Sequence, residues 1–547
     1  MNKKLSKFTS LLIVSSVLVS LLGGCGNKEN TEATKQLSTN QVENTEQTAG
    51  YPMKTDVKLT YWLEADANVT SNFKNLGDTP FAKELQKKTG VEIEFIHPVA
   101  GQAAETMNLM IASNDLPDIM EHSWLAFYDG GPELALQNKV IIELTDLIKN
   151  NAPNLNKYLS EHPDLDKMIK TDSGKYYTFP NTQPDDMLVA TYGPVIREDW
   201  LKELNLESPN TLDDWYNVLK AFKEKKGATA PLSYYYSDRL GPFKRGVFSS
   251  AFGMLIGFYK DENNKVKFGP TEPEYKDFLE TMRKWYKEGL LDNNFAMNDL
   301  RSYEANIVSG KTGATICYPG SGIGKYNPIL KEKDPNAKFV ATTYPILKDG
   351  DKMKICIKSA PFAPVSSASI SGQCKYPEIA AQFLDYGYSE EGSLLFNFGI
   401  EGVSYKMENN YPKMLDEVLK NPDGLPIEQA WAKYARGTYG GPCLRSRAEL
   451  DQYYTMPEQR EALDLWTQNS APLENYMPAL TPKEEEIAEY TNIMNDVNTA
   501  VSEYSIQVIM GTGSTENFGK FIDQLNKMNI GKAIEMQQSA LDRYNNR

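Results

Sequence analysis

The chain has 547 residues, of which 41% are hydrophobic and 24% are charged. Lys and Arg number 58 against 73 Asp and Glu, so the formal net charge is −15 at pH 7. A surplus of negative charge repels phosphate backbones and anionic lipid surfaces, which argues against nucleic acid as a partner. The three histidines stand at unrelated spacings, and no Cys-x-x-Cys or His-Glu-x-x-His pattern occurs. We therefore expect no zinc site and no cofactor.

The first 25 residues have the pattern of a bacterial lipoprotein signal peptide. Lysines precede an apolar run, Leu11–Leu22, that ends at Gly23-Gly24-Cys25. The run has 12 residues, whereas a membrane-crossing helix needs about 20. Residues 1–24 are therefore predicted to be removed, and Cys25 is predicted to carry lipid on the extracellular face of the cell membrane. The alternative is an ordinary secretory peptide, which does not require the cysteine.

Residues 25–55 are predicted to form a flexible tether between the lipid and the folded part. The stretch Gly26–Gly50 has no aromatic residue and almost no large apolar one. Such a segment cannot bury enough surface to offset the entropy of ordering it. The residues that follow Asp56 are numerous enough for two or more domains with sizeable cores.

From Asp56 the chain alternates short strand-like runs with longer helical ones, which is typical of an α/β protein. Val57–Trp62 and Val91–Ile96 are predicted strands. Between them, Thr79–Thr89 is a predicted helix with Thr as its N-cap, Pro at its first position and Gly90 after its last residue. This βαβ unit predicts a right-handed connection and two parallel strands.

Further helices and one more strand follow. The helices are expected over residues 101–113, 211–225, 274–288 and 377–388, and a short strand over 118–120. Trp215 and Trp285 have apolar neighbours at helical spacing, so we expect both in the core. Thr211 and Asp214 have nearly the spacing and chemistry of a capping box, so Asp213 and Asp214 are expected to start a helix rather than to perform acid–base chemistry.

Four cysteines remain besides Cys25. Outside the cell they could form disulfides, and Cys356 with Cys374 would close the shortest loop. Four cysteines allow three connectivities, and the alternative is that Cys317, Cys356, Cys374 and Cys443 are buried thiols.

Several segments, taken in their order and spacing, resemble the extracellular solute-binding lipoproteins of carbohydrate ABC importers. The resemblance covers almost the whole mature chain. It is strongest to family 1 of the extracellular solute-binding proteins, and within that family to the large oligosaccharide-type subgroup from Gram-positive bacteria. The segments that carry it are Met110–Ile119, Val195–Leu201, Ser208–Trp215, Glu288–Asp292, Pro377–Asp385 and Gly399–Tyr405.

This resemblance implies a two-lobe periplasmic-binding-protein-like fold of type II, with a ligand cleft between the lobes. Open α/β sheets bind ligands beyond the carboxyl ends of their strands, and closure of the lobes then buries the ligand. By the resemblance, residues 56–188 plus 312–375 form lobe 1, and residues 189–311 plus 376–547 form lobe 2. It also implies a monomer that binds an oligosaccharide and delivers it to ABC permease subunits.

Similar proteins often carry a calcium-binding loop after the helix that corresponds to the one containing Trp215. This chain reads Lys223 to Ala230 there, where Glu224 and Thr229 offer the only side-chain oxygens. Hard cations need several oxygen ligands at close intervals, so we predict no metal at this loop.

Sugars have flat apolar faces and a rim of hydroxyls, so their sites combine aromatic and polar side chains. Residues of these kinds at predicted strand ends and loops are candidate ligand contacts. In lobe 1 they are Trp62, Glu64, Trp124, Tyr128 and Tyr318; in lobe 2 they are Arg197, Glu401, Tyr405, Trp431 and Tyr439. Core packing is the alternative for the aromatic residues. For Arg197 the alternative is an ion pair with Glu198 or Asp199.

The favoured function is therefore capture of an oligosaccharide without chemistry, and no catalytic residue is proposed. One alternative is a lipid-anchored secreted enzyme that degrades polysaccharides, for which Glu64, Asp129 and Glu401 are conceivable carboxylates. The sequence does not indicate that any two of these carboxylates lie close together in the fold. Another alternative is a peptide-binding transport protein, whose cleft would offer backbone-pairing groups and fewer aromatic residues.

Overall fold

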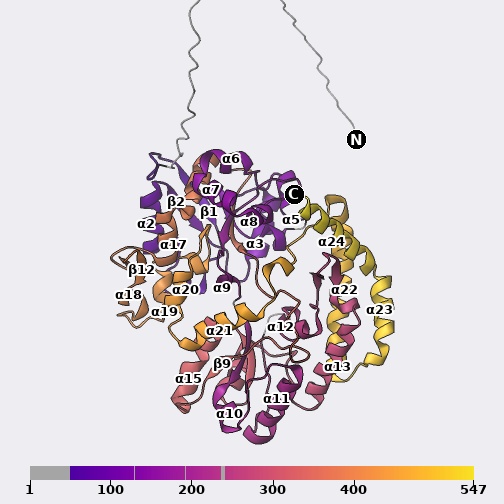
Figure 1. The fold of residues 1–547 in the computed structure, drawn as a ribbon. Helices are drawn as coiled ribbons and strands as arrows, with labels where there is room; N and C mark the ends of the chain where they lie inside the picture. Colours follow the sequence, from indigo (N-terminus) through magenta and orange to yellow (C-terminus); the bar gives the residue numbers. More distant parts are fainter. Residues whose placement is uncertain (1–49, 129, 191, 236–240) are drawn as a thin grey trace, which may run out of the picture. The chain divides into compact units, whose positions relative to one another are not determined.

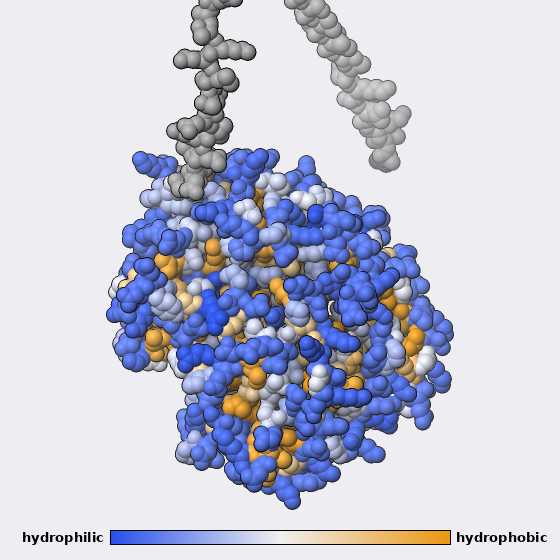
Figure 2. Space-filling view, viewed as in Figure 1, coloured by the Kyte–Doolittle hydropathy of each residue, from blue (hydrophilic) through white to orange (hydrophobic). Residues whose placement is uncertain are grey.

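The structure, a computed structural model, describes residues 50–128, 130–190, 192–235 and 241–547. The predicted signal peptide, Cys25 and nearly all of the predicted tether lie outside these ranges. Within them, no helix combines the length and the apolar character that crossing a membrane requires. Hydrophilic side chains cover most of the face seen in Figure 2, and apolar ones form small separate patches.

The first lobe is organised by a six-stranded sheet with the order β13-β4-β10-β3-β1-β2. Its strands are β1 (Lys58–Trp62), β2 (Glu92–Ile96), β3 (Ile119–Glu121), β4 (Phe179–Thr182), β10 (Phe362–Ile370) and β13 (Cys443–Leu444). Strand β1 is parallel to both β2 and β3, with Leu59 opposite Ile93, so the predicted βαβ unit is confirmed. The long strand β10 is antiparallel to its neighbours β3 and β4.

Helices cover this sheet with apolar side chains. Helix α2 (Pro80–Thr89) begins at the N-cap Thr79, whose side chain accepts from the backbone N–H of Ala82, and it ends at Gly90 in the left-handed region. Helices α3 (Ala103–Ser113), α6 (Thr145–Asn151), α16 (Pro377–Asp385) and α17 (Glu390–Phe398) complete the main helices of this lobe. The core contains Leu59, Phe81, Phe179 and Phe383, all almost fully buried.

The second lobe has a three-stranded antiparallel sheet with the order β8-β5-β9. Its strands are β5 (Gly193–Arg197), β8 (Ala314–Cys317) and β9 (Phe339–Ala341). Helix α11 (Leu212–Lys226) begins with the capping box that Thr211 and Asp214 form, as predicted. Trp215 on α11 and Trp285 on α13 (Glu274–Lys287) are fully buried in one core, which confirms both expectations.

The chain is divided between the lobes differently from the division expected from the sequence. Strands β8 and β9 lie within residues 312–375, which were expected in lobe 1, yet both pair with β5 of the second sheet. Residues 377–444 were expected in lobe 2, but α16, α17 and β13 pack in the core of the six-stranded sheet. The chain therefore crosses between the lobes near residues 190, 360 and 455.

Three helices at the C-terminal end pack against one another, namely α22 (Glu484–Met510), α23 (Phe518–Lys527) and α24 (Ile530–Asn545), and α22 also packs against α13. The end of α24 then contacts the first lobe, as Figure 1 shows near the C-terminus. Arg543 Nε donates to Asp172 Oδ2 at 2.5 Å, and Arg547 donates to the other oxygen of this carboxylate. Arg547 Nη1 also donates to the carbonyl of Lys170 at 2.5 Å. We call these contacts the C-terminal clasp.

The cysteines of the described part, Cys317, Cys356, Cys374 and Cys443, are all free thiols. Burial raises the pKa of the Cys317 and Cys374 thiols to about 12. They therefore stay protonated and act as small apolar side chains, which is the second of the two alternatives that the sequence left open.

Candidate functional site

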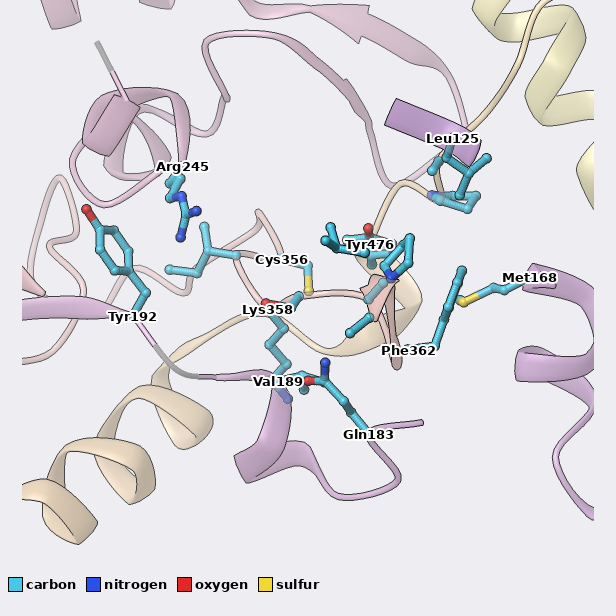
Figure 3. Close-up of a pocket in the computed structure, with 18 of the residues that line it drawn as sticks. Leu125, Met168, Gln183, Val189, Tyr192, Arg245, Cys356, Lys358, Phe362 and Tyr476 are labelled. Atoms are coloured by element: carbon cyan, nitrogen blue, oxygen red, sulfur yellow. The ribbon is translucent and has the colours of Figure 1, made fainter. Parts of the chain in front are cut away.

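A cavity of about 710 Å³ lies between the two lobes, and residues of both lobes line it. Figure 3 shows Tyr192 and Arg245 on one side, Met168 and Phe362 on the other, and Lys358 between them. This volume is in the usual range of ligand pockets, about 300 to 1,000 Å³. Its position between lobes is the one that a two-lobe binding protein uses for its ligand.

The second-lobe wall is built around Tyr192, Tyr318 and Arg245. Tyr192 precedes β5 and Tyr318 follows β8, and Gly193 lies opposite Cys317 in this antiparallel pair. The two tyrosines therefore leave the sheet side by side, with their ring centroids 4.9 Å apart. The Arg245 guanidinium lies 4.9 Å from the centroid of Tyr192 and 5.7 Å from that of Tyr318, and its Nη1 donates to the Tyr318 hydroxyl at 2.5 Å. The result is a cation held against two aromatic faces.

The floor of the cavity is formed where two of the crossing segments meet. The backbone N–H of Ser359 donates to the carbonyl of Val189 at 2.9 Å. The side chain of Lys358 is 4% exposed, and its ammonium donates to Asp186 Oδ2 at 2.7 Å. Cys356 also lines the floor, and burial raises the pKa of its thiol. The cavity thus rests on two of the segments by which the chain crosses between the lobes.

A second cavity, of about 820 Å³, lies in the first lobe at the carboxyl ends of the parallel strands. Glu64 follows β1, His97 follows β2 and His122 follows β3, and all three line this cavity. Val365 on β10 lines both cavities. The carboxyl strand ends are where open α/β sheets place ligands.

His122 is held in an aromatic cage. It is 6% exposed, stacks on Phe127 at 4.8 Å between centroids, and meets the edges of Trp62 at 5.7 Å and Trp124 at 6.3 Å. Burial lowers the pKa of His122 to about 4, so the imidazole is neutral at physiological pH. The neutral imidazole ring presents an apolar face, so His122 adds no charge to the cavity wall.

Glu121 at the end of β3 is occupied by protein donors, although it also lines the second cavity. Arg436 donates to both of its oxygens, at 2.8 and 2.9 Å, and the Tyr61 hydroxyl donates at 2.8 Å. The backbone N–H of Gly441 adds a fourth bond at 3.1 Å. This carboxylate therefore shapes the cavity wall instead of serving as an available acceptor.

Of the residues predicted from the sequence as ligand contacts, Tyr318 lines the first cavity and Glu64 the second. Trp62, Trp124 and Trp431 are each 1% exposed, so the structure places them in the core and not on a cavity wall. Trp62 and Trp124 still matter to the site, because they form the layer behind His122. Tyr128 is half-buried, and its hydroxyl accepts from Asn138 Nδ2 at 3.0 Å.

The structure places Arg197, Glu401 and Tyr405 away from both cavities. Arg197 is 5% exposed and forms a two-bond ion pair with Asp199, at 2.5 and 2.8 Å, which was its alternative interpretation. Glu401 and Tyr405 line a separate hollow of the first lobe, because the loop that carries them follows α17 on the outer side of the sheet. The side chain of Tyr439 and residue Asp129 lie outside the described part of the chain.

Sequence reasoning missed most of the first cavity. Its unpredicted lining residues include Gln183, Tyr192, Lys244, Arg245, Lys358 and Phe362. One signal existed for Tyr192, which stands directly before a strand, as Tyr318 stands directly after one. The pairing of those strands was not predicted, so their shared edge could not be found.

Metal-ligating side chains do not gather in the described residues: no group of three or more His, Cys, Asp or Glu is arranged to hold an ion. The segment from Lys223 to Ala230, for which the sequence predicts no metal, begins in the last turn of α11 and continues past Gly227, which lies in the left-handed region.

A model of the bacterial extracellular solute-binding protein family matches residues 68–393. The chain belongs to this family, and the two-lobe α/β fold predicted from the sequence is confirmed by its likeness to solved members. The alginate-binding protein AlgQ2, solved without calcium ion, is 26% identical, with a TM-score of 0.71 over 90% of this chain and 99% of that one. FusA from S. pneumoniae in complex with kestose has a TM-score of 0.70 over 89% of this chain and 99% of that one; at 23% identity it shows the fold alone.

Curated relatives extend the similarity along the chain. The fructooligosaccharide ABC transporter substrate-binding protein FusA of Streptococcus pneumoniae is 26% identical in an alignment covering 99% of each chain. The polygalacturonan/rhamnogalacturonan-binding protein YtcQ of Bacillus subtilis is 27% identical over 59% of this chain and 63% of its own. Lipoprotein LipO of the same organism is 28% identical over 63% of this chain and 67% of its own.

Proposed function

We propose that this protein captures an oligosaccharide between its lobes and presents it to the permease subunits of an ABC importer. One observation carries the proposal: the inter-lobe cavity of about 710 Å³ has aromatic faces on both lobes, with polar groups at its floor and rim. Ring faces pack on the C–H faces of sugars, while polar groups bond the hydroxyls. The similarity to FusA, a fructooligosaccharide ABC transporter substrate-binding protein, extends over 99% of each chain and supports this proposal.

Binding without bond cleavage is the favoured reading of the site. Glycosidases of the common kinds need two carboxyl groups on opposite sides of the scissile bond, about 5 to 9.5 Å apart. Among the described residues that line the first cavity there is no Asp or Glu. Of the described carboxylates that line the second cavity, Glu121 is engaged by Arg436 and Tyr61, and Asp66 accepts from the backbone N–H of Asn68 at the start of a short helix, so Glu64 is the one least engaged by protein donors. The relatives FusA and YtcQ are also named as binding proteins.

The proposal includes the location of the protein, which is the extracellular face of the cell membrane. Lipid on Cys25 would hold it at the extracellular face of the membrane, and residues up to about 55 would let the folded part reach a permease. The lipoprotein relative LipO supports this anchoring. The protein is proposed to act as a monomer, since one chain supplies both walls of the cavity.

Thermal unfolding of the full chain in detergent tests the proposal. A panel of neutral and acidic oligosaccharides is added, and each sugar is afterwards checked for cleavage. Ligand at 100 times its dissociation constant stabilises the folded state by about 2.7 kcal/mol. Tyr318→Ala should reduce the shift, whereas Tyr376→Ala, at an exposed tyrosine before α16, should leave it unchanged. Cleaved sugar would instead indicate an enzyme, and a response to peptides alone would indicate a peptide carrier.

A further inference from the structure

Exposed apolar side chains gather at the second cavity. Phe127 is 49% exposed, Val99 and Val365 are exposed as well, and all three line this cavity. Single apolar side chains on a protein surface need no explanation, but several around one cavity are typical of a surface that a ligand covers. The occupant that fits this wall therefore has an apolar face of its own.

Phe127 is held as a rigid platform. It is the last residue of the short helix α4 (Trp124–Phe127), and its ring stacks on His122 with 4.8 Å between the centroids. His122 in turn meets the edges of Trp62 and Trp124, which are buried. The stack covers one face of the Phe127 ring, and the exposure of the side chain leaves the other face open to the cavity. A ring fixed in this way loses little freedom when a flat ligand packs against it.

Glu64 supplies hydrogen-bond acceptors beside this apolar wall. It follows β1, is exposed, and accepts one long bond, at 3.3 Å, from the backbone N–H of Gly101. Asp66 lines the same cavity, and one of its oxygens accepts from the backbone N–H of Asn68. An ionised carboxylate has about four acceptor positions and cannot donate. The occupant of the second cavity therefore has to supply donors.

A hexopyranose unit meets both requirements. Its ring has a flat face of C–H groups that packs on aromatic rings, and its hydroxyls donate hydrogen bonds from the rim. Two adjacent hydroxyls can donate together to the two oxygens of one carboxylate. The small side chains of Ala100, Ala103 and Ala104 also line this cavity of about 820 Å³ and leave room for such a ring.

Resting on the proposed function, we infer that the second cavity binds one hexopyranose unit of the captured oligosaccharide. The C–H face of this unit packs on the ring of Phe127, and adjacent hydroxyls donate to the carboxylate of Glu64. Val365 lines both cavities, so this unit and the units in the first cavity share a wall residue. Phe127 thus takes the role that the sequence suggested for Trp124, and Trp124 supports it from behind His122.

Calorimetric titration of the full chain in detergent tests the role of Phe127. The probe is whichever of maltotriose, cellotriose, raffinose and kestose stabilises the protein most against heat. Phe127→Ala should weaken binding at least about tenfold, and Phe127→Leu, which stays apolar but lacks a ring face, about threefold to tenfold. Phe127→Trp should bind within about twofold of the unchanged protein, because it keeps a ring face. Leu109→Ala, at an exposed apolar residue of α3 outside both cavity walls, is the control.

Glu64→Gln tests the hydroxyl contact. It removes the charge and half of the acceptor capacity, so binding of the same sugar should weaken about threefold to tenfold. Glu105→Gln, at an exposed carboxylate of α3, should change nothing. Phe127 and Glu64 are both exposed, so the unfolding temperature without sugar should stay the same in these variants, which separates contact with the ligand from support of the fold.

The outcomes distinguish this inference from the proposed function. Full affinity in Phe127→Ala or in Glu64→Gln would overturn the inference and leave the proposed function standing. Full affinity in Phe127→Leu would also overturn it, because apolar burial alone would then account for the contact. Absence of binding by all four probe sugars would overturn the inference, and absence of any response to the wider oligosaccharide panel would overturn the proposed function as well.

Discussion

Arg543 in α24 bonds Asp172 of the opposite lobe, with 2.5 Å between Nε and Oδ2. The C-terminal clasp is therefore a fourth connection between lobes that the chain already links near residues 190, 360 and 455. Tyr544, which neighbours Arg543, also lines the inter-lobe cavity. A change in the angle between the lobes must either pivot about the clasp or break it.

Asp172→Ala should loosen the two lobes. The substitution removes the acceptor of both Arg543 and Arg547, whose bonds to Asp172 are part-buried. We expect the unfolding free energy to fall by about 1 to 2 kcal/mol. The radius of gyration of the ligand-free protein in X-ray scattering should rise. Asp416→Ala, which removes an exposed partner of Lys420, is the control; equal scattering of both variants would refute the role of the clasp.

Arg436→Met should destabilise the first lobe strongly. It leaves the carboxylate of Glu121, 7% exposed, without the cation that donates to both of its oxygens. Removing one partner of a buried ion pair costs about 3 to 5 kcal/mol. Urea unfolding gives the change. Arg436→Met combined with Glu121→Gln should cost less than the sum of the single changes, and strict additivity would contradict the direct coupling of these residues.

Acid should destabilise the protein through His122. Its folded-state pKa, about 4, lies below the ordinary value of 6.5, so between these values the unfolded chain binds the additional proton. Stability from this group is therefore complete above pH 6.5 and is lost as the pH falls toward 4, by at most about 3 kcal/mol. His122→Phe should flatten the stability curve in that window. His162→Phe provides the comparison, and an unchanged slope in the His122 variant would contradict the assignment.

Trp124→Ala and Tyr318→Ala should have opposite effects on the stability of the protein and on its sugar binding. Trp124 is 1% exposed behind His122, so its truncation creates a cavity and should cost about 3 to 5 kcal/mol. Tyr318 is 36% exposed on the cavity wall, so its truncation should cost less than about 1 kcal/mol while it weakens sugar binding. Denaturant unfolding and calorimetric titration of both variants provide the test. A Trp124→Ala protein that stays stable but binds sugar more weakly would indicate that Trp124 contacts the ligand, as predicted from the sequence.

The elements that the sequence predicted are those with complete local signals. Helix α2 has its cap, its proline and its terminal glycine within twelve residues, and Thr211 with Asp214 forms the start of α11 from neighbouring positions. Such signals act within one turn of a helix and do not depend on the remainder of the fold. The ends of α2 and the start of α11 could therefore be predicted without any knowledge of how the lobes are built.

The candidate site could not be predicted in the same way, because it depends on which strands pair, and local sequence signals do not contain that information. Tyr192 and Tyr318 are 126 positions apart by their numbering, and they become neighbours only because Gly193 pairs with Cys317. The end of a strand was also an insufficient guide to exposure. Trp62 ends β1, but a large aromatic side chain gains more by burial behind His122 than by facing the cavity.

The six-stranded sheet has consequences for how the protein acquires its fold. It joins β1 near residue 60 to β13 at residues 443–444, so the sheet cannot be completed until about four-fifths of the chain is available. Until then β4 keeps an unpaired edge, which is open to pairing with other chains. Contacts so distant in sequence also slow folding. The edge of β4 therefore stays without its partner until the last fifth of the chain begins, and it is the part of the sheet most open to pairing with other chains during folding.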